Sequence, residues 1–390
     1  MAAEPSLYGP ISRADVEVLA EVAAAHAGDV DVHGRFPVEA ITAAKDAGLL
    51  SMWLRTDQGG VGANLAQTAA VVERVGRECA STAMILAMHY IQLGCLRTHG
   101  NTPFLADLTS RIADEGLLLA SATTEIGIGG DTRRSTCSVE DHGDGTFELV
   151  KKAPVISYAE DSDLILVTAR RGPDSPPTDQ VLVVCEKGDL ELEQTSAWNT
   201  IGFRGTCSPG YLLTARSTLQ HIFPQDYADI SARTMLPLAH TLWGHCWLGL
   251  AEGAVAVARR FVREQARRVP GSTPPGALRL AEIDVDLATM RARVHAAAAR
   301  FDAEEQIGTP DTSIERAIED NTLKVYASEM VADLVTRALR IVGIAGYGLG
   351  SPWSLDRPLR DSQGAALMVN NDRILSNTAS MELVYRGGPR

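Results

Sequence analysis

The chain has 390 residues, more than one ordinary hydrophobic core accommodates, so two or three domains are expected. Its net charge of −13 and isoelectric point near 5.2 argue against a nucleic-acid-binding protein and against binding to an anionic membrane surface. The cysteines form no C-x-x-C pair, the N-terminus has no signal-peptide pattern, and no run of about 18 apolar residues occurs. These features predict a cytoplasmic protein with no metal site and no membrane span.

Residues 11–117 have the apolar spacing of helices. The pattern predicts helices in ADVEVLAEVAAAHA, FPVEAITAAKDAGLL, LAQTAAVVERVGREC and STAMILAMHYIQLGCLRTHG. Pro37 suits a first helical turn, and the three glycines of TDQGGVGANL predict a loop. The last of these helices is apolar nearly all round, so we expect it to be buried.

Residues 118–222 change character, because short apolar runs now alternate with Gly, Pro and Asp clusters. The runs FELVKKAPVIS, DLILVTAR, VLVVCEKG and YLLTA predict strands. No helical pattern interrupts them, which indicates a small antiparallel β domain.

Residues 228–390 return to long helical patterns, broken at VPGSTPPG. Their lengths are typical of an up-and-down bundle. We therefore expect a multi-domain α+β protein with an N-terminal helical domain over 1–117, a middle β domain over 118–227 and a C-terminal helical domain over 228–390.

The segment LLASATTEIGIGGD, residues 118–131, joins a short apolar strand to a glycine-rich turn. Hydroxyls of Ser121, Thr123 and Thr124 come at the strand end, followed by Gly129 and Gly130. Glycines let backbone N–H groups approach a bulky ligand closely. The segment suits a heterocycle with carbonyl groups or a phosphate, and a simple turn between strands is the alternative.

Six segments in order resemble those of the acyl-CoA dehydrogenase superfamily of flavoproteins. They are FPVEAITAAKDAGLL with QGGVGANL, then SATTEIGIGGD, KKAPVISYAEDSDLILVTAR, WNTIGFRGTCS, LKVYASEMVADLVTRALRIVGIAGYG and SLDRPLRD. The resemblance covers nearly the whole chain. It implies a C-terminal four-helix bundle, a dimer or tetramer, and FAD as cofactor, with the flavin ring beside Thr124 and Ser157.

The resemblance also implies which residues bind the cofactor. They are Ser121, Thr123, Thr124, Gly129, Gly130, Ser157, Arg267, Gly343, Gly346 and Asn371. Arg267 would meet a phosphate from a neighbouring subunit, and the two glycines of VGIAGYG would lie on the adenosine side. A solvated arginine and a helix C-cap are the simpler readings of these residues.

The family's catalytic base is the weak point of the resemblance. Acyl-CoA dehydrogenation needs a carboxylate to take the α-proton. Counting from Arg360-Asp361 puts Val369 at the usual position, and a second branch of the family would place the base at Ala239, beside His240. Asp372 and His240 remain as candidate bases, although a helix cap and a core histidine are the simpler readings.

The leading hypothesis is an FAD-dependent acyl-thioester dehydrogenase that acts on an acyl-CoA or acyl-carrier-protein substrate. Hydride would pass to flavin N5, and electron-transfer flavoprotein or oxygen would accept the electrons. The alternative is a two-component flavin monooxygenase, in which reduced flavin reacts with oxygen and no base is needed. A third hypothesis is an inert FAD-binding partner subunit of a heteromeric dehydrogenase.

Overall fold

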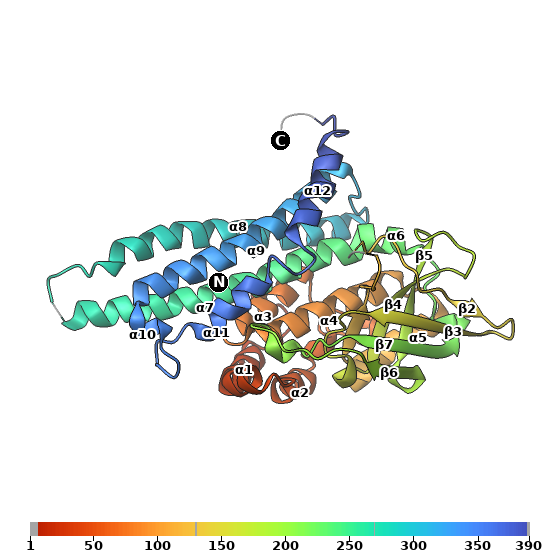
Figure 1. The fold of residues 1–390 in the computed structure, drawn as a ribbon, viewed down its shortest axis with the longest axis horizontal. Helices are drawn as coiled ribbons and strands as arrows, with labels where there is room; N and C mark the ends of the chain where they lie inside the picture. The colour runs from red at the N-terminus through yellow and green to blue at the C-terminus, as the bar shows by residue number, and fades with distance from the viewer. Residues whose placement is uncertain (1–6, 129–130, 269, 388–390) are drawn as a thin grey trace, which may run out of the picture.

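The computed structural model describes residues 7–128, 131–268 and 270–387. The chain builds helices, then strands, then helices again, in the order that the sequence predicts. Three long C-terminal helices run side by side along the molecule, the N-terminal helices lie beneath them, and the β region covers one end (Figure 1). The predicted fold, with N-terminal helical, middle β and C-terminal helical parts, is confirmed.

The N-terminal region contains five α-helices among the described residues. They are α1 Arg13–His33, α2 Val38–Asp46, α3 Leu65–Gly76, α4 Ala80–His99 and α5 Pro103–Glu115. Helix α3 starts with a capping box, in which the Asn64 and Gln67 side chains each accept from the other's backbone N–H. The apolar α4 is buried along almost its whole length, as predicted.

Helix α5 is not among the helices that the pattern predicts. Its start nevertheless carries two local signals, since the Thr102 side chain accepts from the Leu105 N–H and Pro103 occupies the first turn. Only Leu105, Leu108, Thr109 and Ile112 of this helix are buried. This narrow apolar stripe explains why hydrophobic periodicity alone is a weak guide here.

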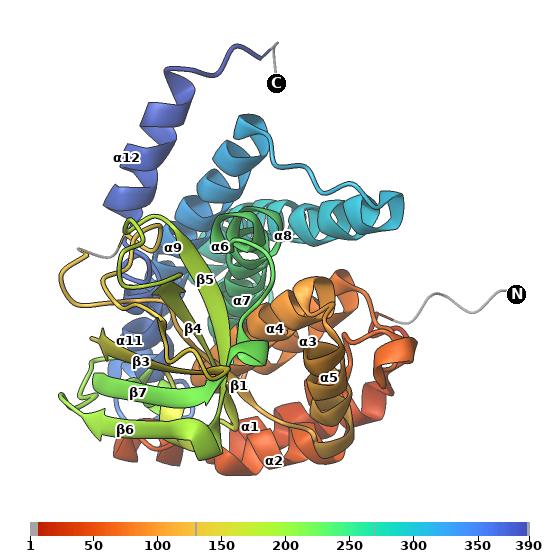
Figure 2. The ribbon, with the colours of Figure 1, turned by 90° about the vertical axis from the view of Figure 1, so that its right-hand side faces the viewer.

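The middle region forms two sheets. The first has the order β1–β4–β5, with β1 Leu119–Ala122, β4 Leu164–Arg170 and β5 Gln180–Glu186. The second has the order β2–β3–β7–β6, with β2 Glu140–Asp141, β3 Thr146–Ala153, β6 Leu190–Gln194 and β7 Tyr211–Thr218. Figure 2 shows the strands of the two sheets beside the helices.

One strand pair corrects the expectation of a purely antiparallel β domain. Strand β1 pairs with β4 in parallel, with Leu119 opposite Leu164. The connection between them passes through β2 and β3 of the other sheet, so β1 cannot fold back on β4 as a hairpin. The pair buries its side chains on both faces, which is typical of parallel strands.

The C-terminal region is built on α7 Leu236–Arg268, α8 Gly276–Ile307 and α9 Ile314–Val342. A short helix α6, Tyr227–Ile230, and a π-helical turn, Ser231–Met235, lead into α7. Shorter helices follow, α10 Ile344–Tyr347, α11 Asp356–Gly364 and α12 Asn371–Glu382. Helix α11 packs on α9 and α7 as a fourth helix beside the three long ones.

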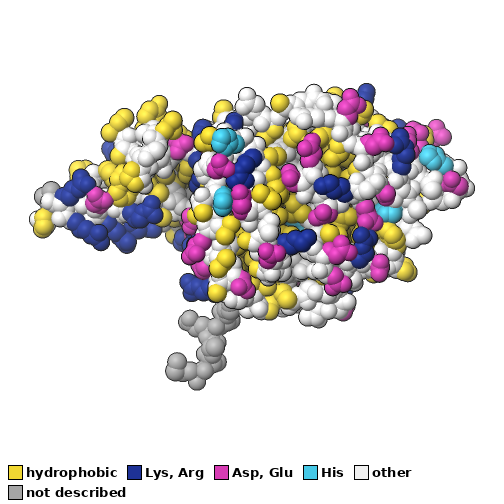
Figure 3. Space-filling model, turned by 90° about the horizontal axis from the view of Figure 1, so that it is seen from below, with side chains coloured by type: hydrophobic (Ala, Val, Ile, Leu, Met, Phe, Trp, Pro, Cys, Tyr) yellow, Lys and Arg dark blue, Asp and Glu magenta, His cyan; other side chains and the backbone are white. Residues whose placement is uncertain are grey.

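Charged side chains are unevenly distributed over the surface of the molecule. Although the net charge is −13, arginines gather at the end of the bundle where helix α7 ends (left in Figure 3). Arg263, Arg267 and Arg268 are exposed there. Within the described ranges, no helix has the length and hydropathy needed to cross a membrane.

Candidate functional site

A cavity of about 680 Å³ opens where the β region meets the start of α7, the start of α9 and helix α12. Its wall includes residues of the β region and of the C-terminal helices, among them Asp131, Gln180, Ser231, His240, Asp320, Val369 and Ile374. The π-helical turn before α7 contributes Ser231 and Ala232 to the wall. Such turns are frequent at functional sites, and the volume is that of a small-molecule site.

Two positions singled out from distant parts of the sequence meet at this cavity. Val369, where the resemblance places the family's usual base, and His240, next to the alternative position, both line it. Ala239 is buried and its side chain carries no titratable group. Val369 has φ of 49°, a left-handed conformation that is strained for a β-branched residue and is often associated with functional loops.

His240 is 4% exposed, and its Nδ1 lies 3.0 Å from the backbone oxygen of Asp320. Because a carbonyl only accepts, Nδ1 carries the proton. Burial lowers the pKa of His240 to about 3, and the nearby Lys324 charge acts in the same direction. His240 is therefore a neutral hydrogen-bonding group at neutral pH.

The charged side chains on the cavity wall are engaged with partners. Arg316 Nε donates to Asp320 Oδ2 at 2.9 Å, and Arg133 Nε donates to Asp131 Oδ1 at 3.2 Å. Asp311 accepts from the Ser313 backbone N–H, and Arg373 also has a partner. Each of these charged side chains thus has a polar partner, and that of Asp311 is a backbone N–H group and not a cation.

Asp372 lies outside this wall. It is exposed in the first turn of α12, where its backbone N–H donates to Asn370 Oδ1 at 2.9 Å. Asn370, not Asp372, is the N-cap of that helix. The predicted capping role of Asp372 is thus wrong by two positions, and Asp372 is not among the residues that line the cavity.

The hydroxyls expected beside a flavin ring belong to neighbouring segments. Thr124 Oγ1 donates to the Val155 backbone oxygen at 3.2 Å, and Ser157 Oγ accepts from Ser208 Oγ at 2.8 Å. Thr124 thus keeps an acceptor lone pair and Ser157 keeps a proton to donate. This donor–acceptor pair fits the alternating carbonyl and N–H groups on the edge of a flavin. Thr123, Thr124 and Ser157 are half-buried, as is Ser121 on β1.

The other expected cofactor residues are scattered in this single chain. Gly129 and Gly130 lie outside the described residues. Arg267 is exposed at the end of α7 farthest from the β region (Figure 1). Gly343, with φ of 70°, caps α9, and Gly346 is buried in α10. Arg267 and Thr124 could therefore contact one cofactor only if a second copy contributed the arginine.

Asn371 belongs to a buried polar network that the sequence did not predict. Lys324 Nζ on α9 donates to Asn371 Oδ1 at 2.7 Å and lies 3.4 Å from the Ala365 backbone oxygen. These two contacts hold both ends of the loop that carries Val369. Burial lowers the pKa of Lys324 to about 8.

A second unpredicted interaction, the ion pair of Glu125 with Lys151, holds the segment that carries Ser121, Thr123 and Thr124. Glu125, next to Thr124, pairs with Lys151 on β3 and accepts from the backbone N–H groups of Thr136 and Cys137. Burial alone would raise the pKa of Glu125, but the Lys151 charge and the hydroxyls of Thr136 and Ser135 lower it. An acidic residue three positions after the end of the apolar strand β1 was the available signal.

The W-x-x-x-G-x-R-G-T-x-S and R-D segments meet at the junction of all three regions. The Phe203 backbone N–H donates to Asp361 Oδ1 at 2.6 Å, and Arg360 pairs with Asp31 of α1. A Cβ on Gly202 would come within 2.3 Å of the Arg360 backbone oxygen, so only glycine fits there. These motif residues hold the regions together.

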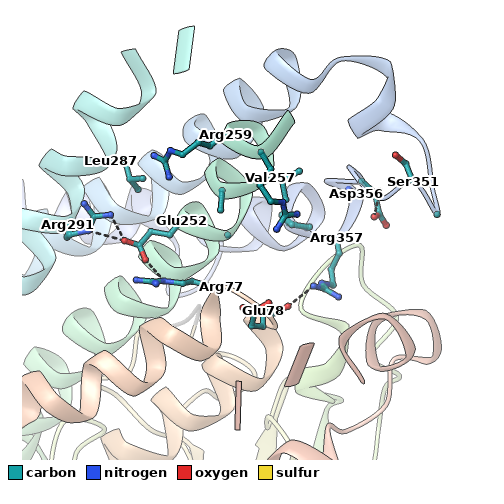
Figure 4. Close-up of a pocket in the computed structure, with 16 residues that line it drawn as sticks. Arg77, Glu78, Glu252, Val257, Arg259, Leu287, Arg291, Ser351, Asp356 and Arg357 are labelled. Atoms are coloured by element: carbon teal, nitrogen blue, oxygen red, sulfur yellow. Dashed lines mark hydrogen bonds and ion pairs between the residues drawn. The ribbon is translucent and has the colours of Figure 1, made fainter. Parts of the chain in front are cut away.

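A second pocket, of about 630 Å³, lies between α3, α7, α8 and residues 350–358. Figure 4 shows Glu252 between Arg77 and Arg291, with hydrogen bonds to both. Arg357 Nη2 donates to the Glu78 backbone oxygen at 2.6 Å. The pocket contains none of the residues predicted for the flavin or for the base.

Beside this pocket, Glu73 Oε2 accepts from His245 Nδ1 at 3.1 Å and His295 Nε2 at 2.8 Å. These three side chains have the spacing of metal ligands. Metal-bound histidines almost always donate their second N–H, yet His245 Nε2 is buried without a partner. The arrangement is better explained as a hydrogen-bonded link between α3, α7 and α8. Burial would raise the pKa of Glu73, but the two histidines outweigh it and lower it.

The comparisons with known proteins agree with this architecture. Residues 13–115 match the acyl-CoA dehydrogenase N-terminal domain and residues 232–380 the acyl-CoA dehydrogenase C-terminal domain. The probable acyl-CoA dehydrogenase FadE25 of Mycobacterium tuberculosis is 25% identical over 369 residues, covering 93% of this chain and 92% of the relative. The probable FMNH2-dependent monooxygenase SfnC of Pseudomonas putida is 26% identical over 328 residues, covering 80% of each.

Among solved structures, TdsC of Paenibacillus sp. A11-2 in complex with FMN and indole has a TM-score of 0.84 at 18% identity. The match covers 97% of this chain and 98% of TdsC, and it shows a shared fold. The two domain matches together extend over most of the chain. The chain belongs to the acyl-CoA dehydrogenase family of flavoproteins.

Proposed function

We propose that this protein is a flavin-dependent monooxygenase that uses reduced flavin and oxygen to oxygenate a small molecule held in the cavity. The observation that carries the proposal is the absence of a free carboxylate on the described cavity wall. The resemblance puts the family's carboxylate at Val369 or Ala239, which are both aliphatic, and the acidic side chains on the wall are engaged. Abstraction of an α-proton would be left to His240, whose pKa, lowered by burial to about 3, makes it a weak base.

Reduced flavin would supply two electrons, so that one oxygen atom of O₂ enters the substrate and the other leaves as water. The residues of the chain would bind and orient the flavin and the substrate. Thr124 and Ser157 would hold the flavin edge, and the engaged charges of the wall would leave the substrate in an uncharged environment. The similarity to SfnC supports the same reaction class.

An acyl-thioester dehydrogenase remains the second candidate. The matches to both helical domains of acyl-CoA dehydrogenases and the similarity to FadE25 favour it. It would pass electrons to an electron-transfer flavoprotein or to oxygen.

The test supplies the protein with reduced FMN or reduced FAD, ¹⁸O₂ and a panel of small neutral aromatics. The expected result is a product heavier by one ¹⁸O atom, formed only when protein, reduced flavin and oxygen are all present. Butyryl-CoA is then added anaerobically to protein with oxidised flavin. Bleaching of the flavin by butyryl-CoA, without ¹⁸O incorporation in the first experiment, would establish the dehydrogenase instead. Tight flavin binding with neither reaction would indicate an inert partner subunit.

We further propose that the flavin is FAD and that two copies of the chain share each site. Ile344, Tyr347 and Leu349 are 85%, 70% and 80% exposed around the loop expected to meet the adenosine. Large apolar side chains gathered in one place favour an interface. Light scattering should report a dimer or tetramer, and FAD should bind more tightly than FMN. A monomer with equal affinity for both would contradict the shared site.

A further inference from the structure

We propose that the cavity selects a small neutral molecule carrying an N–H or O–H group, and that His240 Nε2 accepts the hydrogen bond from it. The inference deepens the proposed function, because it names the substrate class of the same site. No residue of the wall is given this role by the family resemblance, which treats His240 only as a candidate base.

The first step is the state of the imidazole. Its Nδ1 is committed to the Asp320 backbone oxygen as a donor, so the neutral ring leaves a lone pair on Nε2. Among the described residues no donor reaches Nε2. His240 Nε2 is not among the fully buried polar atoms that lack a partner, so this partnerless atom is accessible to a water-sized molecule. The open space that His240 lines is the cavity.

The second step is an independent acceptor on the same wall. Gln180, at the start of β5, is 3% exposed and donates from Nε2 to the Thr132 backbone oxygen at 3.2 Å. Its Oε1 is buried without a partner. A buried acceptor without a donor costs free energy, and because Gln180 lines the cavity, a small rotation of its amide would let a ligand donor recover that free energy.

The third step is charge. Since the arginines of the wall already have partners, an anionic ligand would lose its hydration without gaining a counter-ion. The remaining wall includes the apolar side chains of Leu236, Val369 and Ile374. Acceptors without donors, engaged charges and apolar walls together select a neutral hydrogen-bond donor.

The test measures binding by calorimetry to the protein loaded with oxidised flavin, without reductant, so no turnover occurs. The probes are indole, a neutral aromatic with one N–H donor, and 1-methylindole, which lacks that donor. We expect indole to bind about tenfold more tightly than 1-methylindole. Equal affinities for the two probes would overturn the proposal, and so would the absence of indole binding at millimolar concentration. It would also be overturned if butyryl-CoA displaced bound indole at a lower concentration than 1-methylindole needs to displace it.

Variants of α7 assign the preference to the imidazole. His240→Leu should bring the indole to 1-methylindole ratio close to one, and His240→Gln, which can still donate to Asp320 and accept in the cavity, should retain much of it. Thr241→Val is the matched control, because Thr241 is the next residue, is fully buried and has an unpartnered Oγ1 outside the cavity wall. It should keep the parent ratio. A preference that survives in folded His240→Leu would refute the role of His240.

The binding experiment and the oxygenation experiment fail separately. Selective indole binding without ¹⁸O incorporation into any aromatic would retain this inference and reject the monooxygenase. Oxygenation with no preference for N–H donors would retain the monooxygenase and reject the role of His240.

Discussion

Lys151 Nζ lies 3.2 Å from Glu125 Oε2, and the two side chains are 0% and 2% exposed. Lys151 also donates to the Thr168 backbone oxygen at 2.7 Å, so the pair joins β3 to β4 and to the segment after β1. This ion pair connects a strand of one sheet to the segment that follows a strand of the other sheet, and Glu125 is the residue next to Thr124. It therefore links the stability of the β region to the geometry of the expected flavin site.

We predict that Lys151→Met lowers the free energy of unfolding by about 3–5 kcal/mol, because the buried Glu125 carboxylate loses its counter-ion. Urea denaturation followed by circular dichroism measures the change. Lys152→Met is the matched control, since its neighbouring side chain is exposed, and it should remain within about 0.5 kcal/mol of the parent. Adding Glu125→Gln to Lys151→Met should recover part of the loss. A single variant as stable as the parent would show that the pair contributes nothing.

The second prediction concerns the flavin. Thr124→Val and Ser157→Ala should each weaken flavin binding by about tenfold, because each removes one partner of a ring polar group. Quenching of flavin fluorescence during titration gives the affinity. Thr214→Val removes a half-buried hydroxyl of β7 outside the resembling segments and should leave the affinity unchanged. Parent-like affinity in a folded double variant would place the flavin elsewhere.

The third prediction separates Asp372 from its neighbour Asn370. Asp372→Asn should change neither the flavin-dependent reaction nor, beyond about 0.5 kcal/mol, the stability, since the side chain is exposed and does not line the cavity. Asn370→Ala should cost about 1 kcal/mol, because the Asp372 N–H loses its cap. Thermal unfolding and a parallel activity assay distinguish them. Loss of activity in a folded Asp372→Asn variant would restore Asp372 as a base.

The fourth prediction is a pH dependence. In the fold the pKa of His240 is about 3, whereas the unfolded residue titrates near 6.5. Below pH 6.5 the unfolded chain binds the extra proton, so the stability present above that pH is lost as pH falls. His240→Gln removes this proton, and its unfolding free energy should fall less steeply than the parent's, by up to about 1.4 kcal/mol per pH unit between pH 6 and 5.

Urea titrations of the parent and of His240→Gln at four or five pH values provide the comparison. Other buried histidines, such as His89, contribute equally to both proteins and cancel in the difference. Parallel pH profiles would mean that His240 is protonated in the fold, which would also remove its role as a hydrogen-bond acceptor.

Local patterns in the sequence were enough to predict most of the elements. Helix α3 is signalled by its capping residues and apolar spacing, and β4 by an unbroken apolar run, because both depend on residues a few positions apart. Helix α5 was not predicted because its apolar stripe is narrow. The parallel pairing of β1 with β4 could not be predicted from these patterns, since a strand carries no local mark of its partner's direction.

At the site, the sequence determined that Val369 and Ala239 are aliphatic and that hydroxyls follow β1, because these are properties of single positions. Only the tertiary structure decided that Val369 and His240 line one cavity, that Asp372 lies outside its wall, and that Lys324 holds the loop that carries Val369. Partners such as Asp320 for His240 come from different helices. Contacts between such partners arise from the packing of residues far apart in the sequence. The same packing excludes water, which would otherwise weaken the electrostatic interactions between polar groups.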